Sequence, residues 1–386
     1  MGVFLAVLAF VVGLYGMLMV AMAWLAARMP STPPPLNGPL PRVAVLVAAR
    51  DEEDRLPRCI DALLAQDYPA DLLDLYIADD HSTDGTASVI RQVQQRAEHV
   101  VVVLGDEDLD ETPEHPRLHY VRVPDAAGHL RGKANAIHAA IEACDHDLLL
   151  VTDADCAPPP GWVRAHVAYL QDEAVGMVCG HTVVEHDTPL EALQALDWSY
   201  LLASASVLVE AGRPVTAMGN NMAFRRAAYE AVGGYPALPF SVTEDYVLFK
   251  TVADRSGFRV RFPLDPALHN ATLPLTRLGD VYQQRRRWAR GGMRAPLWVH
   301  GIYAIGHLAH LLPLVALVLA PWAGLAAIGV KAGADFALLY TSLRPSGRLG
   351  LLRAFPLFEA YLFVYMVTLP AVLAFFPRIN WKDRKL

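Results

Sequence analysis

The first 27 residues constrain this chain more than any other stretch, because none of them carries a charged side chain. Arg28 is the first charged residue. A helix needs about 20 apolar residues to cross a bilayer, so this segment is long enough to span one. A cleaved signal peptide is the alternative, but the segment lacks a basic amino end and its apolar run is too long. We therefore expect a membrane helix at residues 1–28.

The other end of the chain is apolar as well. With 54% hydrophobic and only 19% charged residues, the chain is more apolar than an ordinary soluble protein. The net charge of -7 gives no sign of nucleic-acid binding, so we expect no nucleic-acid partner. We expect a multi-pass membrane protein with two to three carboxyl-terminal membrane or interfacial helices within 295–377. The candidate spans are Leu297 to about Ala320, Pro321 to about Thr341, and Leu351 to Phe376.

Basic residues at the ends of the spans give conflicting signals about topology. Arg28 and Arg42 place the domain after the first helix in the cytosol, against the plasma (cytoplasmic) membrane. A loop and the basic tail 378–386 are both expected on the cytosolic side, although only one span separates them. One segment is therefore expected to be interfacial or re-entrant. The residues concerned are Arg344, Arg348 and Arg353 in the loop and Arg378, Lys382, Arg384 and Lys385 in the tail.

Polar residues inside the apolar segments suggest helix pairing. Lys331 and Asp335 are spaced to form an ion pair within the membrane or at its surface. For His307 and His310 we favour hydrogen bonds between helices or at the lipid interface over catalysis. These four residues are the only support for an alternative of another class, a transporter or channel subunit with a nucleotide-sensing domain. That alternative leaves the acidic clusters described below unexplained. The four cysteines have no metal-ligand spacing, and we expect reduced, buried thiols.

Between the apolar ends, strand and helix signals alternate. A proline-rich spacer at 29–41 leads into a domain at 42–294. Short apolar runs alternate with helical periodicity, which indicates a mainly parallel sheet wrapped by helices, with an acidic loop at 105–116. The expected strands are Val43 to Ala48, Leu75 to Ala78, Val100 to Leu104, His119 to Val123 and Leu148 to Thr152, and the expected helices are 56–64, 87–97 and 133–144.

Acidic residues follow three of these strands. Asp153 and Asp155 come directly after one apolar run, and two carboxylates so spaced suit a hard divalent cation that holds a diphosphate. The pattern Asp-X-Asp also occurs in ordinary turns. Ligands of such sheets bind beyond the carboxyl ends of the strands, so one crevice is expected to collect all the acids. The other acidic pairs are Asp51 with Glu52 and Asp79 with Asp80.

Four further clusters each allow a structural and a functional interpretation. The turn at 79–86 either caps a helix or binds a nucleoside. Gly128 to Asn135, with Lys133, is either a solvated loop or an anion site at a helix start. Thr243-Glu244-Asp245 either caps a helix or supplies a general base. Gln284 to Trp288 is either a juxtamembrane basic patch or a diphosphate and acceptor site.

Taken in order, the clusters resemble the motifs of the membrane-bound family 2 glycosyltransferases. The four motifs are Asp79-Asp80, Asp153-Ala154-Asp155, Thr243-Glu244-Asp245 and Gln284-X-X-Arg287-Trp288. Residues 219–225 and 233–235 resemble the stretch before the family's catalytic aspartate. Residues 47–53 resemble its first nucleotide loop, with Asp51 where asparagine is commoner. The resemblance covers most of residues 41 to 294.

The resemblance implies an α/β fold of the GT-A (Rossmann-like) type and an inverting, single-displacement transfer. It implies that Asp245, with Glu244 beside it, takes the proton from the acceptor hydroxyl. Asp155 and Asp153 would hold Mg²⁺ or Mn²⁺, which stabilises the leaving diphosphate. The residues implied in donor binding are Ala49, Asp51, Glu52, Asp79, Asp80, Lys133, Asp153, Gln284, Arg287 and Trp288.

Two kinds of enzyme carry such motifs. One adds a single sugar to a hydroxyl of a membrane lipid or isoprenoid, and the other is a processive polysaccharide synthase that extends a glycan through a pore. The few expected spans favour the first. The resemblance also implies a nucleotide-sugar donor, with uridine diphosphate as the family expectation.

Overall fold

The computed structural model describes residues 1–96, 116–125, 129–241, 243–293, 295–375, 380–381 and 384–385. The strand expected at Val100 to Leu104, nearly all of the acidic loop, Gly128 and much of the basic tail lie outside this range. By their contacts the residues form two compact units. One, the helical unit, comprises Met1–Met29, Val184–Val207 and Pro274–Leu386. The other, the sheet unit, comprises Pro30–Val183 and Leu208–Leu273.

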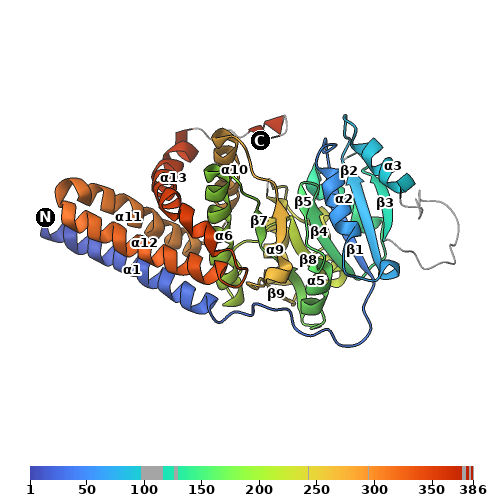
Figure 1. The fold of residues 1–386 in the computed structure, drawn as a ribbon, viewed down its shortest axis with the longest axis horizontal. Coiled ribbons are helices and arrows are strands. Elements are labelled where there is room, and N and C mark those ends of the chain that lie inside the picture. Colours follow the sequence, from blue (N-terminus) through green and yellow to red (C-terminus); the bar gives the residue numbers. More distant parts are fainter. Residues whose placement is uncertain are drawn as a thin grey trace. The chain divides into compact units, whose positions relative to one another are not determined.

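A seven-stranded sheet in the order β3-β2-β1-β4-β8-β6-β9 is the centre of the sheet unit (Figure 1). β1 lies parallel to β2 and β4, and β2 lies parallel to β3, as the sequence predicts. β8 is antiparallel to both β4 and β6, so the sheet is mixed. The strands are β1 Val43–Ala49, β2 Leu73–Asp79, β3 Arg117–Arg122, β4 Leu148–Asp153, β6 Val175–Cys179, β8 Asn221–Arg225 and β9 Arg259–Arg261.

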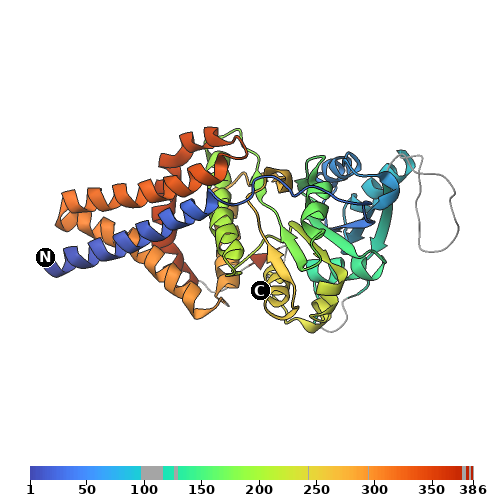
Figure 2. The same ribbon diagram turned by 90° about the horizontal axis from the view of Figure 1, so that it is seen from below.

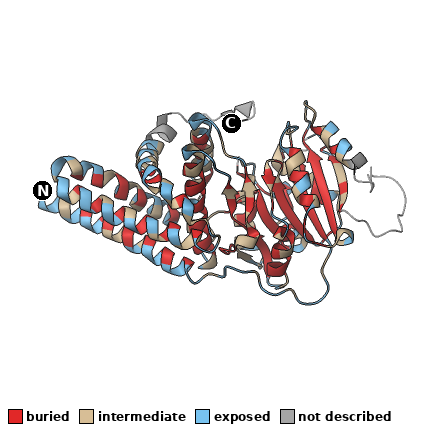
Figure 3. Cartoon of the chain, viewed as in Figure 1, coloured by how far each residue is buried: buried red, intermediate tan, exposed pale blue. Residues whose placement is uncertain are grey.

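The continuous apolar runs of β1, β2 and β4 form strands because both faces of the sheet are covered. Val45 and Val47 in β1 and Leu75 and Ile77 in β2 are fully buried. Figure 3 shows these strands in the colour of buried residues. A second, three-stranded sheet in the order β5-β10-β7 contains β5 Cys156–Ala157, β10 Asn270–Thr272 and β7 Thr182–Val184.

Helices of the sheet unit confirm the periodicity predicted from the sequence. Leu56, Ile60 and Leu63 of α2 are fully buried, as are Ala136 and Ile137 of α4. Thr243 precedes α9 but its side chain makes no capping hydrogen bond. The helices are α2 Leu56–Leu64, α3 Thr86–Arg96, α4 Lys133–Glu142, α5 Trp162–Leu170, α7 Arg226–Glu230, α8 Gly234–Ala237 and α9 Glu244–Arg255, with short 3-10 turns at Ala70–Leu72 and Pro266–Leu268.

Long apolar helices make up the helical unit. α1, α11 and α12 pack against one another, and both Figure 1 and Figure 2 show them side by side. Large apolar side chains such as Phe10, Val318 and Trp322 are 69%, 82% and 85% exposed. The elements are α1 Gly2–Ala26, α6 Pro189–Glu210, α10 Leu278–Gly292, α11 Leu297–Leu319, α12 Pro321–Leu343, the 3-10 helix Leu349–Ala354, α13 Phe355–Phe375, β11 Asn380–Trp381 and β12 Arg384–Lys385.

Five helices among the described residues are long and apolar enough to cross a membrane. Four match the spans expected from the sequence. The fifth, α6, was not expected, and 72% of its apolar stretch is buried inside the protein. Exposed apolar side chains on the other helices suit a bilayer rather than water, and they indicate membrane association. The number and the orientation of the spans stay predictions.

A buried ionic cluster joins α1, α6, α12 and α13 within the helical unit. Lys331 and Asp335 are both fully buried and lie 2.9 Å apart, which confirms the predicted pair. Lys331 also contacts Glu359 at 2.7 Å. The hydroxyls of Tyr15 and Tyr200 donate to Asp335 Oδ1 at 2.6 and 2.9 Å. One buried ammonium thus balances two carboxylates. His307, as expected, makes a hydrogen bond between helices, to the Met366 carbonyl at 2.8 Å.

Replacing Lys331 by methionine is expected to destabilise the protein by about 3–5 kcal/mol, because it leaves two buried carboxylates without their cation. Thermal unfolding of the purified protein in detergent measures the loss. Lys250→Met is the matched control, since its partner Asp254 is 46% exposed and such pairs contribute at most about 1 kcal/mol. Equal shifts in Tm for the two variants would contradict the prediction.

Candidate active site

The strand register brings the acidic residues to one edge of the sheet. Ala49 of β1 pairs with Asp79 of β2, and Ala48 pairs with Asp153 of β4. These strands are parallel, so their carboxyl ends meet at the same edge and the loops that follow them start there. All six predicted carboxylates belong to the ends of these strands or to those loops.

The first two loops are tied to each other by hydrogen bonds. The Asp51 amide donates to Ser82 Oγ at 3.0 Å, and Asp51 Oδ1 accepts from the Thr83 amide at 2.7 Å. The Glu52 amide donates to Thr86 Oγ1 at 2.9 Å, and the Asp80 amide donates to the Ala49 carbonyl at 2.8 Å. Asp51 therefore holds the two loops together with its side chain, and its contact with the nucleotide stays a prediction.

Asp79 and Asp80 differ in how firmly they are held. Asp79 accepts from the Ser82 amide and from the Tyr120 hydroxyl, both at 2.9 Å, so each carboxylate oxygen has a short hydrogen bond. Asp80 has longer contacts, 3.6 Å to Arg50 and 3.4 Å to His81. A ligand can replace long contacts more readily than short ones. Of the two acids, Asp80 is thus the better placed to bind a ligand.

Asp155 is the most electrostatically crowded of these acids. Burial, together with the nearby Asp153 and Glu52 carboxylates, raises the pKa of the Asp155 carboxyl well above its ordinary value. A bound cation relieves such repulsion, so these residues fit a divalent metal. No group of three or more His, Cys, Asp or Glu side chains among the described residues is arranged to hold a metal. Two carboxylates suffice where phosphate oxygens of a substrate supply the other ligands, as is usual for Mg²⁺.

Lys133, at the start of α4, connects the Asp-X-Asp motif with α9. Its ammonium forms an ion pair with Asp153 and donates to the Gly219 carbonyl at 3.0 Å. Burial by itself would lower the pKa of Lys133, but the carboxylates of Asp153, Glu244 and Asp245 outweigh it and raise the pKa above the ordinary value. Lys133 therefore stays charged. Its ammonium is paired with Asp153 of the Asp-X-Asp motif.

Asp245 is fixed by the peptide groups around it. Its Oδ2 accepts from the Gly219 amide at 2.7 Å, and its Oδ1 accepts from the Tyr246 amide at 2.8 Å. The carbonyl of the same Gly219 receives Lys133. One residue therefore joins the lysine beside the Asp-X-Asp acids to Asp245, the expected base. Only the resemblance drew attention to residues 219–225, and nothing in the sequence revealed this bridging role.

Buried asparagine side chains hold the chain next to Gly219 in place. The Asn270 side chain donates to the Asn220 carbonyl at 2.7 Å and to Thr152 Oγ1 at 2.8 Å. Trp162 Nε1 donates to Asn221 Oδ1 at 2.8 Å, and Asn221 in turn donates to the His181 carbonyl at 2.9 Å. These hydrogen bonds fix the peptide groups next to Gly219, although Asn270 Oδ1 is buried without a hydrogen-bond partner among the described residues.

Gly219→Ala is expected to lower both activity and stability, because an added Cβ would lie 2.5 Å from Asp245 Cβ and 2.7 Å from its Oδ2. Overpacking of this kind costs about 1–3 kcal/mol and would displace the carboxylate. Initial rates and Tm measure the two effects. Gly161→Ala is the control in the same unit, because nothing lies within 4 Å of its Cβ position. An active, stable Gly219→Ala protein would contradict the bridging role.

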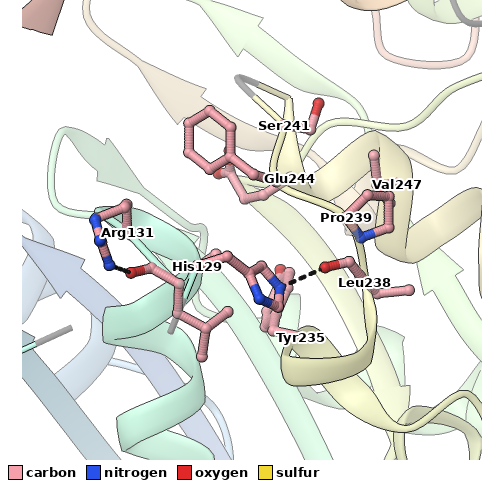
Figure 4. A pocket seen from close by; sticks show the side chains of 11 residues that line it. His129, Arg131, Tyr235, Leu238, Pro239, Ser241, Glu244 and Val247 are labelled. Atoms are coloured by element: carbon pink, nitrogen blue, oxygen red, sulfur yellow. Dashed lines mark hydrogen bonds between the residues drawn. The ribbon is translucent and has the colours of Figure 1, made fainter. Parts of the chain in front are cut away.

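A pocket lies beside Glu244, between the loop before α4 and the loop before α9 (Figure 4). His129 Nε2 donates to the Leu238 carbonyl at 2.7 Å and joins the two loops. Most of the lining side chains are apolar or aromatic. The lining residues are His129, Leu130, Arg131, Ala134, Tyr235, Leu238, Pro239, Phe240, Ser241, Glu244 and Val247. The pocket thus adjoins Glu244 of the Thr-Glu-Asp motif.

The Gln-X-X-Arg-Trp motif belongs to the helical unit. Gln284, Arg287 and Trp288 lie on α10, and all three are partly buried. The indole of Trp288 packs edge-to-face on Trp198 of α6, with 4.9 Å between ring centroids. The fully buried arginine of this stretch is Arg285, which sequence reasoning did not single out.

Comparison with known proteins agrees with the order of the motifs. A family model described as Glycosyl transferase family 2 matches residues 44–233. A second, described as Glycosyl transferase family group 2, matches residues 148–377, which is more than half of the chain. This chain is a family 2 glycosyltransferase. The predicted family and the predicted class of enzyme are confirmed.

Relatives of this glycosyltransferase are named for different products. It is 26% identical over 283 residues to a beta-monoglucosyldiacylglycerol synthase of Synechocystis sp., covering 70% of this chain and 53% of that protein. It is 25% identical over 256 residues to a poly-beta-1,6-N-acetyl-D-glucosamine synthase of Staphylococcus aureus, covering 65% and 54%. The chain spans about half the length of the curated relatives it matches.

A solved structure confirms the predicted GT-A fold. The mannosyltransferase PcManGT from Pyrobaculum calidifontis, in complex with GDP-Man and Mn²⁺, superposes with a TM-score of 0.60. The alignment covers 96% of this chain and 99% of that one, at 22% sequence identity. At this identity the likeness shows the fold alone.

Proposed function

We propose that this glycosyltransferase moves one sugar, with inversion, from a nucleoside diphosphate sugar to a hydroxyl of a membrane lipid or isoprenoid. The observation that carries the proposal is the Gly219 bridge, which links Lys133 and the Asp-X-Asp acids to Asp245. A donor diphosphate and an acceptor hydroxyl need these two sets of groups held together. The exposed apolar helices and the named glycolipid synthase support a lipid acceptor.

The proposed chemistry is a single displacement. Asp245 accepts the proton of the acceptor hydroxyl while that oxygen bonds to the anomeric carbon. The bond from that carbon to the diphosphate oxygen breaks, and the nucleoside diphosphate leaves with the electron pair. Asp155 and Asp153 would hold Mg²⁺ or Mn²⁺, which would neutralise charge on the diphosphate. Glu244 lies beside the acceptor pocket and adds negative charge there.

The residues proposed for donor binding come from several elements. In the sheet unit, Ala49, Asp51, Glu52, Asp79 and Asp80 would surround the nucleoside, with Lys133 and Asp153 near the diphosphate. In the helical unit, Gln284, Arg287 and Trp288 would contact the diphosphate and border the acceptor entrance. Residues 42–294 would form the catalytic domain, on the cytosolic side of the plasma membrane.

Product analysis tests the proposal. Purified protein is incubated with a panel of labelled UDP-glucose, UDP-N-acetylglucosamine and GDP-mannose, each with a bacterial lipid extract and Mg²⁺ or Mn²⁺. We expect a labelled product that partitions into organic solvent and carries one sugar. A long water-soluble polymer would instead favour a processive synthase, the alternative that the poly-N-acetylglucosamine synthase among the relatives supports.

A further inference from the structure

An ion pair that no motif contains fixes the position of the motif tryptophan in the helical unit. Arg285 is fully buried, and Asp197 of α6 is 3% exposed at its side chain. Arg285 Nε donates to Asp197 Oδ2 at 2.5 Å, and its NH2 group contacts the same oxygen. The Tyr361 hydroxyl of α13 donates to that oxygen as well, at 3.4 Å. Three helices therefore meet at one carboxylate.

Trp288 is held between this pair and a second tryptophan. The guanidinium carbon of Arg285 lies 4.2 Å from the centroid of the Trp288 ring. Trp198, next to Asp197 on α6, packs edge-to-face on Trp288 at an interplanar angle of 73°. Arg285 and Trp288 are three residues apart, so they share one face of α10. Two adjacent residues of α6 thus contact two residues on one face of α10.

A buried ion pair is a poor source of stability, because desolvation cancels much of its attraction. Its specific use is to fix one arrangement of its neighbours. A planar guanidinium can bind a carboxylate along its edge while its face contacts an aromatic ring, and lysine cannot do both. Arg285 makes both of these contacts, and its NH1 group also donates to Gln284 Oε1 at 3.4 Å.

We propose that Arg285 and Asp197, together with Trp198, are positioning residues that hold Trp288 in its active orientation. The inference rests on the proposed function, in which Trp288 borders the donor and the acceptor entrance. It adds that α6, which carries no family motif, takes part in catalysis through this contact. Because Arg285 acts through Trp288, its replacement is expected to matter only while Trp288 is present.

A double-mutant cycle between Arg285→Lys and Trp288→Leu tests this dependence. The readout is kcat/KM for release of nucleoside diphosphate from the nucleotide sugar that works best in the donor panel, with the same lipid extract. Arg285→Lys is expected to lower kcat/KM about tenfold in the natural background and less than about twofold when Trp288 is already leucine. Losses that simply multiply would overturn the proposal.

Two additional variants separate positioning from general stability. Lys331→Met disrupts the other buried ionic cluster of the helical unit, and it should lower Tm while changing kcat/KM less than about twofold. Trp198→Leu keeps the ion pair and replaces Arg285→Lys in the cycle if that variant fails to fold. The loss of kcat/KM caused by Trp198→Leu should likewise disappear when Trp288 is already leucine. An equal loss of kcat/KM in Lys331→Met would overturn the positioning role.

Failure of the inference and failure of the proposed function give different results. If Trp288→Leu leaves kcat/KM unchanged, the proposed role of Trp288 is wrong and the inference falls with it. If Trp288→Leu impairs the enzyme but the folded Arg285→Lys and Trp198→Leu proteins keep full activity, only the inference is wrong.

Discussion

Asp245→Asn is expected to reduce sugar transfer by a factor of about 10² to 10⁴, because an amide cannot accept the proton of the acceptor hydroxyl. Asparagine has nearly the same shape, and its side-chain oxygen can still accept one of the two amide hydrogen bonds, from Gly219 or Tyr246, that hold Asp245. Donor binding should therefore persist. Turnover is measured as product formed per enzyme, and donor affinity by equilibrium binding of the nucleotide sugar.

The control for this variant lies on the same helix. Asp254→Asn removes a carboxylate that pairs with Lys250 near the end of α9, far along the helix from its first turn. It should keep full activity. Unchanged sugar transfer by Asp245→Asn would reject the base assignment, whereas loss of donor affinity along with turnover would point to a binding role for Asp245.

Local patterns predicted the first half of the sheet well. The apolar runs ending at Ala49, Asp79 and Asp153 form adjacent parallel strands, and parallel pairing alone brings the acids that follow to one edge. The antiparallel β8 and the mixed character of the sheet were not predicted. Strand direction depends on which neighbour a strand meets in the folded chain, and residues 221–225 carry no local sign of that.

Contacts between residues far apart in the sequence could not be predicted. The helical spacing of Lys331 and Asp335 predicted their pair, but Glu359 belongs to another helix and joins them only in the folded protein. Arg285 occupies one of the two variable positions of the Gln-X-X-Arg-Trp motif, and nothing local distinguishes it from Arg286. Only its contact with Asp197, 88 residues earlier in the chain, distinguishes it.

Neither the apolar helix α6 nor the role of Gly219 was recognised from the sequence. α6 lies inside residues 42–294, which the motifs assign to the catalytic domain, so it was not recognised as a candidate span although its mean hydropathy of 1.3 equals that of α12. Gly219 lies next to two asparagines and reads as an ordinary turn. Its carbonyl accepts a hydrogen bond from Lys133 and its amide donates one to Asp245, and those partners lie 86 and 26 residues away in the sequence.

Asp155→Ala is expected to abolish metal-dependent sugar transfer, with a loss of about 10² or more, because it removes the acid best suited to hold a divalent cation against the diphosphate. Crowding of Asp155 by burial and by the Asp153 and Glu52 carboxylates raises its pKa, and it is this repulsion that a cation relieves. The variant should therefore need far more metal, or fail to use it at any concentration. Rates are measured across Mg²⁺ and Mn²⁺ concentrations.

Metal binding itself provides a readout that does not depend on turnover. The paramagnetic resonance signal of free Mn²⁺ falls when the ion binds, and the natural protein with donor diphosphate present should lower it more than Asp155→Ala does. Asp145→Ala is the control, because that carboxylate is 80% exposed and pairs with Arg42. Full activity of the natural protein in excess chelator would count decisively against a metal at Asp155, and the diphosphate would then depend on Lys133 and other cationic side chains.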